Sequence, residues 1–252
     1  MSTRSPPRNQ LLASLSPHDG EVLRPYLRLV ELTDRAVVIE SGRPDQRVYF
    51  PHSGIISLVA SFSNGQSVDM AMIGRDSVMG ASAALNSWVS RTSAIVRLPG
   101  TASVLEAARL RFAAGESEKF RDAILLHDEA LSMQVEQSAA CNAVHDLEAR
   151  MARRLLRMRD LSGDDTLYGT QELLAEMLGV QRNSVSIIAK AFQKAKLIRY
   201  RRGTIKIVNL EGLRTRACEC YHVIEMHYRR LSQSEPQRDE ERKLEPGRRS
   251  GG

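Results

Sequence analysis

The sequence predicts an α+β fold in which an N-terminal antiparallel β roll is followed by a long helix and then by short helices with a β hairpin. Two observations support this order. Between residues 33 and 104, apolar runs of four to eight residues alternate with Gly, Pro, Asn and Asp, as in short antiparallel strands. Between Gly115 and Gly163 there is no other Gly or Pro, as expected of long helices.

The composition is that of a folded globular protein. The chain has 252 residues, of which 42% are hydrophobic and 26% are charged, enough for one large domain or two smaller ones. It has no apolar run of the length that a membrane span needs, and its first residues lack the apolar stretch of a secretory signal. We therefore expect a cytoplasmic protein without a membrane partner.

Residues 11–116 form the predicted β roll. The strongest turn signal is Asn64-Gly65 between two apolar runs. It predicts a hairpin with a type I′ turn, because that turn needs positive φ at both central residues. The regular spacing of short strands makes a compact barrel or roll the simplest closure.

A long helix is predicted over residues 117–145, with Ser117 as its N-cap. A helix over 117–143 would be about 40 Å long, more than a small β domain needs as cover. Apolar residues recur along one side of it, and a seam of this length often pairs with a copy of itself. The alternative is that the helix packs against its own roll. The predicted dimer seam consists of Phe120, Ile124, Leu131, Val135 and Ala139.

A C-terminal domain is predicted over residues 146–230. It begins with a helix to about residue 159, which is followed by the linker SGDDT. Thr170 can cap the next helix, Gly179 can end it, and a second short helix starts near Arg182. Small or apolar residues lie where these two helices would meet, so the segment resembles the helix-turn-helix of DNA-binding proteins.

The positive charge of the chain is concentrated in this domain. Residues 1–145 have 14 basic and 15 acidic side chains, whereas residues 146–252 have 22 and 15. The stretch 182–206 has eight basic residues and no acidic one, as expected of a surface that binds a polyanion. Two strands are predicted around Arg202-Gly203 in this basic stretch. They would form a basic wing beside the second helix.

In such a motif the start of the second helix faces the DNA bases, and the wing contacts phosphates. The candidates for base readout are Gln181, Arg182, Asn183 and Ser186. The candidates for phosphate contacts are Thr170, Lys190, Arg199, Arg201, Arg202 and Thr204.

The order of roll, long helix, helix-turn-helix and basic wing resembles the Crp/Fnr superfamily of bacterial transcription regulators over roughly residues 11–230. The stretch 74–80, with the sequence GRDSVMG, is similar to the segment that leads into the phosphate-binding part of cyclic-nucleotide sensors. The resemblance implies a cyclic-nucleotide-binding-like roll and a homodimer joined by the long helix. It also implies an effector that alters how two recognition helices are presented.

The sequence departs from cyclic-AMP sensors at the expected ligand site. Ala81 stands where those sensors have a Glu that holds the ribose, and Thr92 stands where they have an Arg that pairs with the phosphate. Arg91 is one residue out of register, which on a strand turns its side chain to the other face. We therefore expect no tight binding of cyclic AMP. The candidate effector pocket consists of Gly80, Ala81, Ser82, Arg91, Thr92 and Ser93.

No cofactor, metal site or catalytic residue is predicted. An iron–sulfur cluster of the oxygen-sensing type is not expected, because no cysteine precedes Cys141. Cys218 and Cys220 would diverge on a helix, and Cys218 with His222 would supply only two ligands. The sequence has no glycine-rich phosphate loop, G-x-S-x-G elbow or H-E-x-x-H motif, so we expect no enzyme activity.

These observations predict a sequence-specific DNA-binding transcription regulator that binds a near-palindromic duplex site as a homodimer. The roll would bind a small-molecule effector that the sequence does not identify, and an activator of this kind would also contact RNA polymerase. The alternative is a regulatory protein whose basic C-terminal module docks an RNA or protein partner. Residues 231–252 are mixed in charge and are predicted to be a disordered tail.

Overall fold

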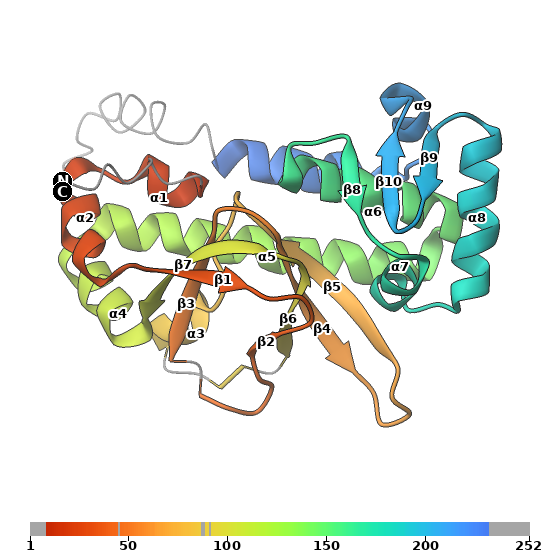
Figure 1. Cartoon of the computed structure of the whole chain (residues 1–252). Coiled ribbons are helices and arrows are strands. Elements are labelled where there is room, and N and C mark those ends of the chain that lie inside the picture. Colours follow the sequence, from red (N-terminus) through yellow and green to blue (C-terminus); the bar gives the residue numbers. More distant parts are fainter. Residues whose placement is uncertain (1–8, 45, 87–88, 91, 232–252) are drawn as a thin grey trace, which may run out of the picture.

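The computed structural model describes residues 9–44, 46–86, 89–90 and 92–231. The described part of the chain begins with short helices at one end of the molecule, and the strands of a β roll follow (Figure 1). The first elements are α1 (Gln10–Ser14), α2 (Pro17–Leu23) and the 3-10 turn η1 (Arg24–Tyr26). The predicted tail over 231–252 lies outside the described residues except for residue 231.

The β roll consists of two antiparallel sheets with the strand orders β1-β7-β3 and β2-β6-β4-β5. Their inner faces are lined by apolar residues such as Phe50 and Ile56, which are fully buried. The expectation of short antiparallel strands is therefore confirmed. The strands are β1 (Arg28–Leu32), β2 (Val37–Ile39), β3 (Arg47–Pro51), β4 (Ile55–Ser61), β5 (Ser67–Ile73), β6 (Ser93–Leu98) and β7 (Gly100–Glu106).

The hairpin between β4 and β5 forms at the predicted position but with a different turn. Gly65 has a φ of 82°, whereas Asn64 is not among the residues with positive φ. The Gly65 amide donates a hydrogen bond to the Phe62 carbonyl, and the Phe62 amide donates to the Gln66 carbonyl. A three-residue loop that ends in a left-handed glycine has this pattern, so the predicted type I′ turn is wrong.

Long helices connect the roll to the C-terminal part of the chain. Helix α3 (Ala81–Asn86) lies within the roll, and α4 (Ala107–Glu116) follows its last strand. Helix α5 (Glu118–Val144) then runs along the length of the molecule, and α6 (Leu147–Ser162) follows it (Figure 1). The Ser117 side chain accepts a hydrogen bond from the Phe120 amide, so the predicted N-cap of the long helix is confirmed.

Four of the five residues of the predicted dimer seam on α5 pack against the roll of the same chain. Phe120 and Ile124 are fully buried in a cluster with residues of the roll and of α4. Leu131 and Val135 are half-buried and pack against the core between the two sheets, whereas Ala139 is exposed. Phe120 and Ile124 therefore cannot form the seam, because their side chains are already buried against their own roll. The seam stays a prediction for Leu131, Val135 and Ala139.

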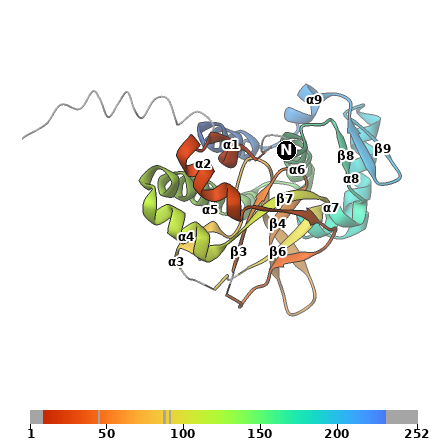
Figure 2. The same ribbon diagram turned by 60° about the vertical axis from the view of Figure 1, so that its left-hand side comes forward.

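The C-terminal part combines three short helices with a three-stranded sheet of order β8-β10-β9. It lies at the opposite end of α5 from α2 and α4 in both views (Figures 1 and 2). A final helix over 220–231 runs back beside α5, where Ile224 and Tyr228 pack against Ala130. The elements are β8 (Thr166–Tyr168), α7 (Gln171–Leu178), α8 (Arg182–Lys194), β9 (Ile198–Arg201), β10 (Thr204–Ile207) and α9 (Leu210–Arg214).

Within the described part of the chain, no helix has both the length and the apolar character that crossing a membrane requires.

His127 makes the stability of this fold sensitive to pH. Its side chain is buried in α5, and this burial lowers the pKa of His127 to about 4. Because the unfolded chain binds the proton near pH 6.5, stability is lost as the pH falls from 6.5 towards 4. When the pH is lowered from 7 to 5, we expect the free energy of unfolding of the natural chain to fall by about 2 kcal/mol more than that of the His127→Gln variant. Urea unfolding at both pH values measures this, and identical pH dependence in the two proteins would contradict it.

Candidate nucleic-acid interface

The helix-turn-helix forms from short local signals at the predicted positions. The Thr170 hydroxyl accepts a hydrogen bond from the Leu173 amide at 3.0 Å and caps α7. Gly179 has a φ of 65° and ends this helix in the left-handed region, which glycine adopts without strain. The Val180 amide then donates to the Ala175 carbonyl, and α8 begins at Arg182. The chain therefore turns sharply between the two helices.

The inner faces of α7 and α8 form one core with α6 and the small sheet. Leu174 and Leu178 of α7 and Val185 of α8 are buried within it, and Ala175 is 3% exposed where the helices meet. Burial of these apolar side chains fixes which face of α8 remains in solvent. The exposed face of α8 is therefore set by packing.

That exposed face carries most of the residues predicted to read bases. Gln181, Arg182 and Asn183 are exposed at the start of α8. Ser186 is half-buried, and its hydroxyl donates to the Gln171 side-chain oxygen at 2.5 Å, so it joins the two helices instead of pointing outward. The role of Ser186 in base readout stays a prediction.

Two features of α8 were not predicted from the sequence. Ile187 is 68% exposed, although it is a large apolar residue. It lies four residues after Asn183 and shares its face of the helix, a spacing that could have identified it. Arg182 Nε lies 3.9 Å from Glu172 Oε2, so this guanidinium has a weak partner on α7.

The predicted basic wing is a two-residue hairpin. Arg201 pairs with Thr204 across the strands β9 and β10, and the two turn residues Arg202 and Gly203 have φ values of 47° and 78°. Positive φ at both positions is the mark of a type I′ turn. The Gly203 carbonyl accepts a hydrogen bond from the Gly169 amide, which holds the wing tip beside the start of α7.

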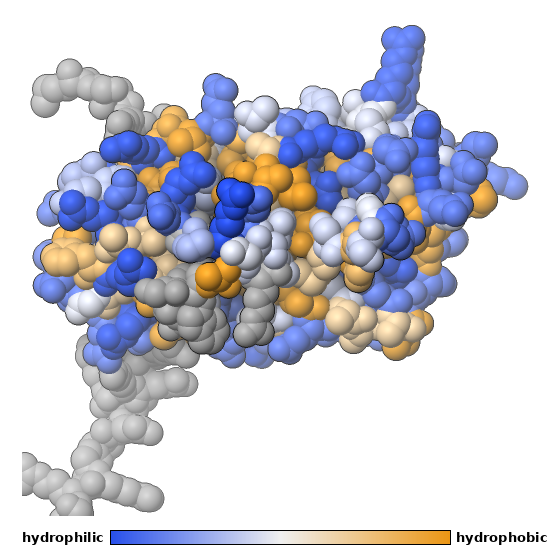
Figure 3. All heavy atoms as spheres, turned by 90° about the horizontal axis from the view of Figure 1, so that it is seen from below, coloured by the Kyte–Doolittle hydropathy of each residue, from blue (hydrophilic) through white to orange (hydrophobic). Residues whose placement is uncertain are grey.

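The wing and the outer face of α8 together form a basic surface. Its lysine and arginine side chains are exposed, and none forms an ion pair within the described residues. The right-hand end in Figure 3, where α8 lies, is mostly hydrophilic, whereas apolar residues gather around the middle of that view. The surface consists of Lys190, Lys194, Lys196, Arg199, Arg201, Arg202 and Lys206.

Buried charges connect α7 to the roll. Arg97 of β6 bonds to Asp69 of β5 at 2.6 Å and 3.2 Å, and its other nitrogen bonds to Glu176 of α7 at 2.9 Å. Asp69 is completely buried and Arg97 is 4% exposed. Arg154 of α6 donates to the carbonyls of Asp69 and Met177, and burial lowers the pKa of Arg154 to about 10. The position of α7 is therefore tied to the β4–β5 hairpin side of the roll.

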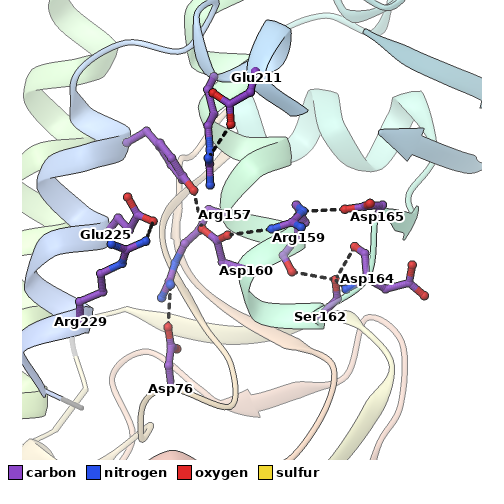
Figure 4. A network of polar contacts seen from close by, with 12 residues as sticks. Asp76, Arg157, Arg159, Asp160, Ser162, Asp164, Asp165, Glu211, Glu225 and Arg229 are labelled. Atoms are coloured by element: carbon purple, nitrogen blue, oxygen red, sulfur yellow. Dashed lines mark hydrogen bonds and ion pairs between the residues drawn. The ribbon is translucent and has the colours of Figure 1, made fainter. Parts of the chain in front are cut away.

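A second polar network joins α6 to the roll and the final helix (Figure 4). Arg157 bonds to Asp76 at 2.6 Å, and its guanidinium lies 4.2 Å from the centre of the Tyr228 ring. The Tyr221 hydroxyl donates to Asp160 at 3.1 Å, and burial raises the pKa of Asp160. These contacts hold α6, the roll and the helix over 220–231 together.

A cavity of about 460 Å³ lies between the roll and α5. Of the predicted effector residues, Gly80, Ala81, Ser82 and Thr92 line it. Ser93 does not line it, and its hydroxyl instead accepts a hydrogen bond from the Ser41 amide. The prediction for Arg91 lies outside the described residues.

The chemistry of the cavity wall is apolar and acidic. Leu131 and Val135 of α5 contribute apolar surface, and Asp128 and Glu136 of the same helix contribute carboxylates. Burial raises the pKa of Asp128. Among the described residues that line the cavity there is no Lys or Arg.

The three cysteines meet at the end of α5, which the sequence reasoning missed. Cys141 and His145 lie with Cys218 and Cys220 so that their four ligand atoms are within 4.8 Å of one another. Cys218 precedes the helix over 220–231, so the rule that helical residues two apart diverge does not apply to it. His222 is exposed and bonds to Glu225 instead. We call these four residues, Cys141, His145, Cys218 and Cys220, the cysteine–histidine cluster.

Comparisons with known proteins agree with this architecture. Residues 149–216 match the family model of the Crp-like helix-turn-helix domain. The search of curated proteins gives no match. Two solved structures of the same fold from Thermus thermophilus are named as transcriptional regulators and not as enzymes.

Three similar solved structures match this chain over nearly their whole length. FixK2 from Bradyrhizobium japonicum has a TM-score of 0.67 at 17% identity, over 76% of this chain and 98% of that chain. The c-di-GMP responsive global regulator CLP from Xanthomonas campestris has a TM-score of 0.63 at 16% identity, over 77% and 100%. A Crp/Fnr-family transcriptional regulator from Eubacterium rectale has a TM-score of 0.63 at 16% identity, over 81% and 96%. The chain therefore has the fold of the Crp/Fnr transcription regulators and carries a Crp-like helix-turn-helix domain.

Proposed function

We propose that the protein is a homodimeric transcription regulator that reads a near-palindromic DNA site through α8 and its basic wing. Residues 11–116 are the effector domain, 117–145 the dimerisation helix and hinge, and 146–230 the DNA-binding domain. An effector bound in the roll changes how the two recognition helices are presented.

The observation that carries this proposal is the exposed face of α8 beside the wing. Arg182 and Asn183 have the donor and acceptor groups for bidentate contacts to guanine and adenine, each worth about 1–3 kcal/mol of discrimination. Ile187 adds an apolar contact of the kind that recognises the thymine methyl group. The basic side chains of the wing contact phosphates, which position the protein without reading sequence.

The proposed dimer uses the face of α5 that the roll leaves open. Leu125, Ser132 and Ala139 follow one another at intervals of seven residues along this face, and Ala143 continues it. Leu125 is 48% exposed, and small residues at the other positions allow close approach of a second α5. Two copies joined in this way present recognition helices about 34 Å apart, one turn of DNA.

The same face of α5 borders the effector cavity, since Ser132 and Glu136 line it. A ligand there contacts both the roll and the helix that joins the two copies. Such a ligand changes DNA binding only if its affinity differs between the dimer arrangement that can bind DNA and the arrangement that cannot.

We expect cyclic AMP to bind this cavity weakly. A cyclic phosphate needs charge-assisted hydrogen bonds, and the described wall offers the carboxylates of Asp128 and Glu136 in place of a guanidinium. Isothermal titration calorimetry with the full chain should give an affinity weaker than micromolar. Micromolar or tighter binding of cyclic AMP would contradict this expectation.

We expect the Asn183→Ala variant to lose one base preference within each half-site. The amide of Asn183 is exposed at the start of α8 and has no other role in the described structure. Loss of one bidentate contact lowers discrimination at that base by about 1–3 kcal/mol, while affinity for other sequences changes little. Selection of duplex DNA from a random pool by both proteins measures this.

The matched control is Lys194→Ala, at the far end of the same helix. It should leave all base preferences unchanged. Identical preferences in the Asn183→Ala variant and the natural chain would remove Asn183 from the readout.

A further inference from the structure

The cysteine–histidine cluster joins two segments that are far apart in the sequence. Cys141 lies in the last turn of α5, and His145 is the residue that ends this helix. Cys220 is the first residue of the helix over 220–231, and Cys218 lies two residues before it. These are all the cysteines of the chain, and each of them is buried.

The distances within the cluster suit a single tetrahedral metal ion. A zinc ion with zinc–sulfur bonds of about 2.3 Å places its ligand atoms about 3.8 Å apart. The Cys141 and Cys218 sulfurs are 3.5 Å apart, and the Cys220 sulfur is 3.6 Å from His145 Nδ1. The four ligands of an iron–sulfur cluster are divided among two or more iron atoms, so ligand atoms on different irons stand further apart than neighbours around one ion. Here all four ligand atoms lie within 4.8 Å of one another, which favours one ion.

The histidine is oriented as a metal ligand. Its Nδ1 faces the sulfurs, while its Nε2 lies 3.2 Å from the carboxylate of Glu219. A carboxylate that holds the second ring nitrogen is the common support of a metal-bound histidine. On the other side, the Gln137 side-chain amide donates to the Cys220 sulfur at 3.0 Å, as hydrogen-bond donors around metal thiolates do.

The surroundings also provide the charge that such a site needs. Three thiolates, one neutral histidine and a divalent ion carry a net charge of −1. Arg153 is buried and interacts electrostatically with Cys141, and its guanidinium donates to the Ser138 hydroxyl at the long distance of 3.4 Å. Among the described residues no carboxylate pairs with this buried cation. Arg150 also interacts electrostatically with Cys141 and Cys218. A buried cation requires an anion nearby, which a metal–thiolate centre supplies.

We propose that Cys141, His145, Cys218 and Cys220 bind one tetrahedral Zn²⁺ ion that fixes the hinge between α5 and α6. Sulfur and imidazole ligands in a tetrahedron favour zinc over magnesium, calcium or manganese. All four positions are filled by protein groups, so the site is structural and not catalytic.

The location connects this ion to the DNA-binding part of the chain. Helix α6 begins at Leu147, two residues after His145. Arg150 of α6 also donates to the Leu178 carbonyl at 2.8 Å, at the end of α7. Zinc would therefore hold the α5–α6 hinge against the final helix and keep Arg150 in place beneath the helix-turn-helix.

The test is the metal content of the full chain, purified with reductant and exposed to Zn²⁺. We expect one zinc per chain, released when a mercurial thiol reagent is added and detected with a chromogenic chelator. Replacement by Co²⁺ should give the intense visible absorption of tetrahedral cobalt and thiolate-to-cobalt charge transfer. These measurements need no variant, so a folding defect cannot obscure them.

Variants then assign the ligands. Cys141→Ser and Cys220→Ser should each lose the tetrahedral cobalt spectrum, and Glu219→Gln should keep it with an affinity about 10- to 100-fold weaker. The matched control is His222→Ala, two residues after Cys220, which should bind zinc as the natural chain does.

Three results would each overturn the proposal. One is a chain with three free thiols that takes up less than a tenth of an equivalent of zinc. The second is a Cys141–Cys218 disulfide in protein purified without reductant, together with failure to bind zinc after reduction. The third is bound iron with acid-labile sulfide. None of these outcomes would affect the proposed DNA binding, which is measured separately.

Discussion

Replacing Asp69 with alanine is expected to lower the free energy of unfolding by about 3–5 kcal/mol, because it leaves the Arg97 guanidinium buried without its main partner. Asp69 is completely buried and accepts two hydrogen bonds from Arg97, which is 4% exposed. The remaining partner of Arg97 is Glu176 of α7, so the loss should also loosen α7 from the roll. Chemical denaturation of both proteins measures the change.

Two controls separate this effect from the loss of an ordinary ion pair. Glu40→Ala removes an exposed i,i+3 partner of Arg43 and should change stability by less than about 1 kcal/mol. The double variant Asp69→Leu, Arg97→Met removes both buried charges and should recover much of the lost stability. If Asp69→Ala lowered the free energy of unfolding as little as Glu40→Ala does, the pair of Asp69 and Arg97 would not hold α7 against the roll.

Neutralising the wing is expected to weaken DNA binding without changing its sequence preference. The variant combines Arg199→Ala, Arg201→Ala and Arg202→Asn, with asparagine chosen because position 202 has a φ of 47° and asparagine tolerates the left-handed region. If each arginine contacts one phosphate, the slope of log affinity against log salt should fall in magnitude by about 2.7. Fluorescence anisotropy with a duplex at several salt concentrations measures the slope.

The matched control removes three exposed arginines from the roll, by the substitutions Arg24→Ala, Arg28→Ala and Arg43→Ala. It changes the net charge by the same amount and should leave the slope unchanged. Equal slopes for the two triple variants would mean that the wing attracts DNA only through net charge, and would contradict its phosphate contacts.

The sequence predicted the parts of the fold that depend on local signals. Ser117 as a cap, Gly179 as a helix end and the hairpin at Arg202-Gly203 each act over a few residues, and the structure has all three. The same holds for the apolar faces of α7 and α8, where Leu174 and Val185 are buried at helical spacing. The surface proposed to read DNA could be predicted for this reason.

Features that depend on contacts between distant segments were predicted poorly. The apolar stripe of α5 indicated burial but not the partner, and Ile124 packs against its own roll instead of a second copy. The cysteine–histidine cluster brings Cys141 to Cys218, 77 positions away, and no local spacing reveals this contact. Asp69 and Glu176 meet through Arg97 for the same reason.

We propose that α8 and the wing of a dimer read a two-fold-symmetric DNA site. The most direct test is selection of duplex DNA from a random pool by the purified full chain, at a stated salt concentration near physiological. The selection is run with and without cell extract, because an effector can be required. We expect a near-palindromic motif with half-site centres about one helical turn apart, about 10 base pairs. Recovery of no symmetric motif under either condition would contradict it.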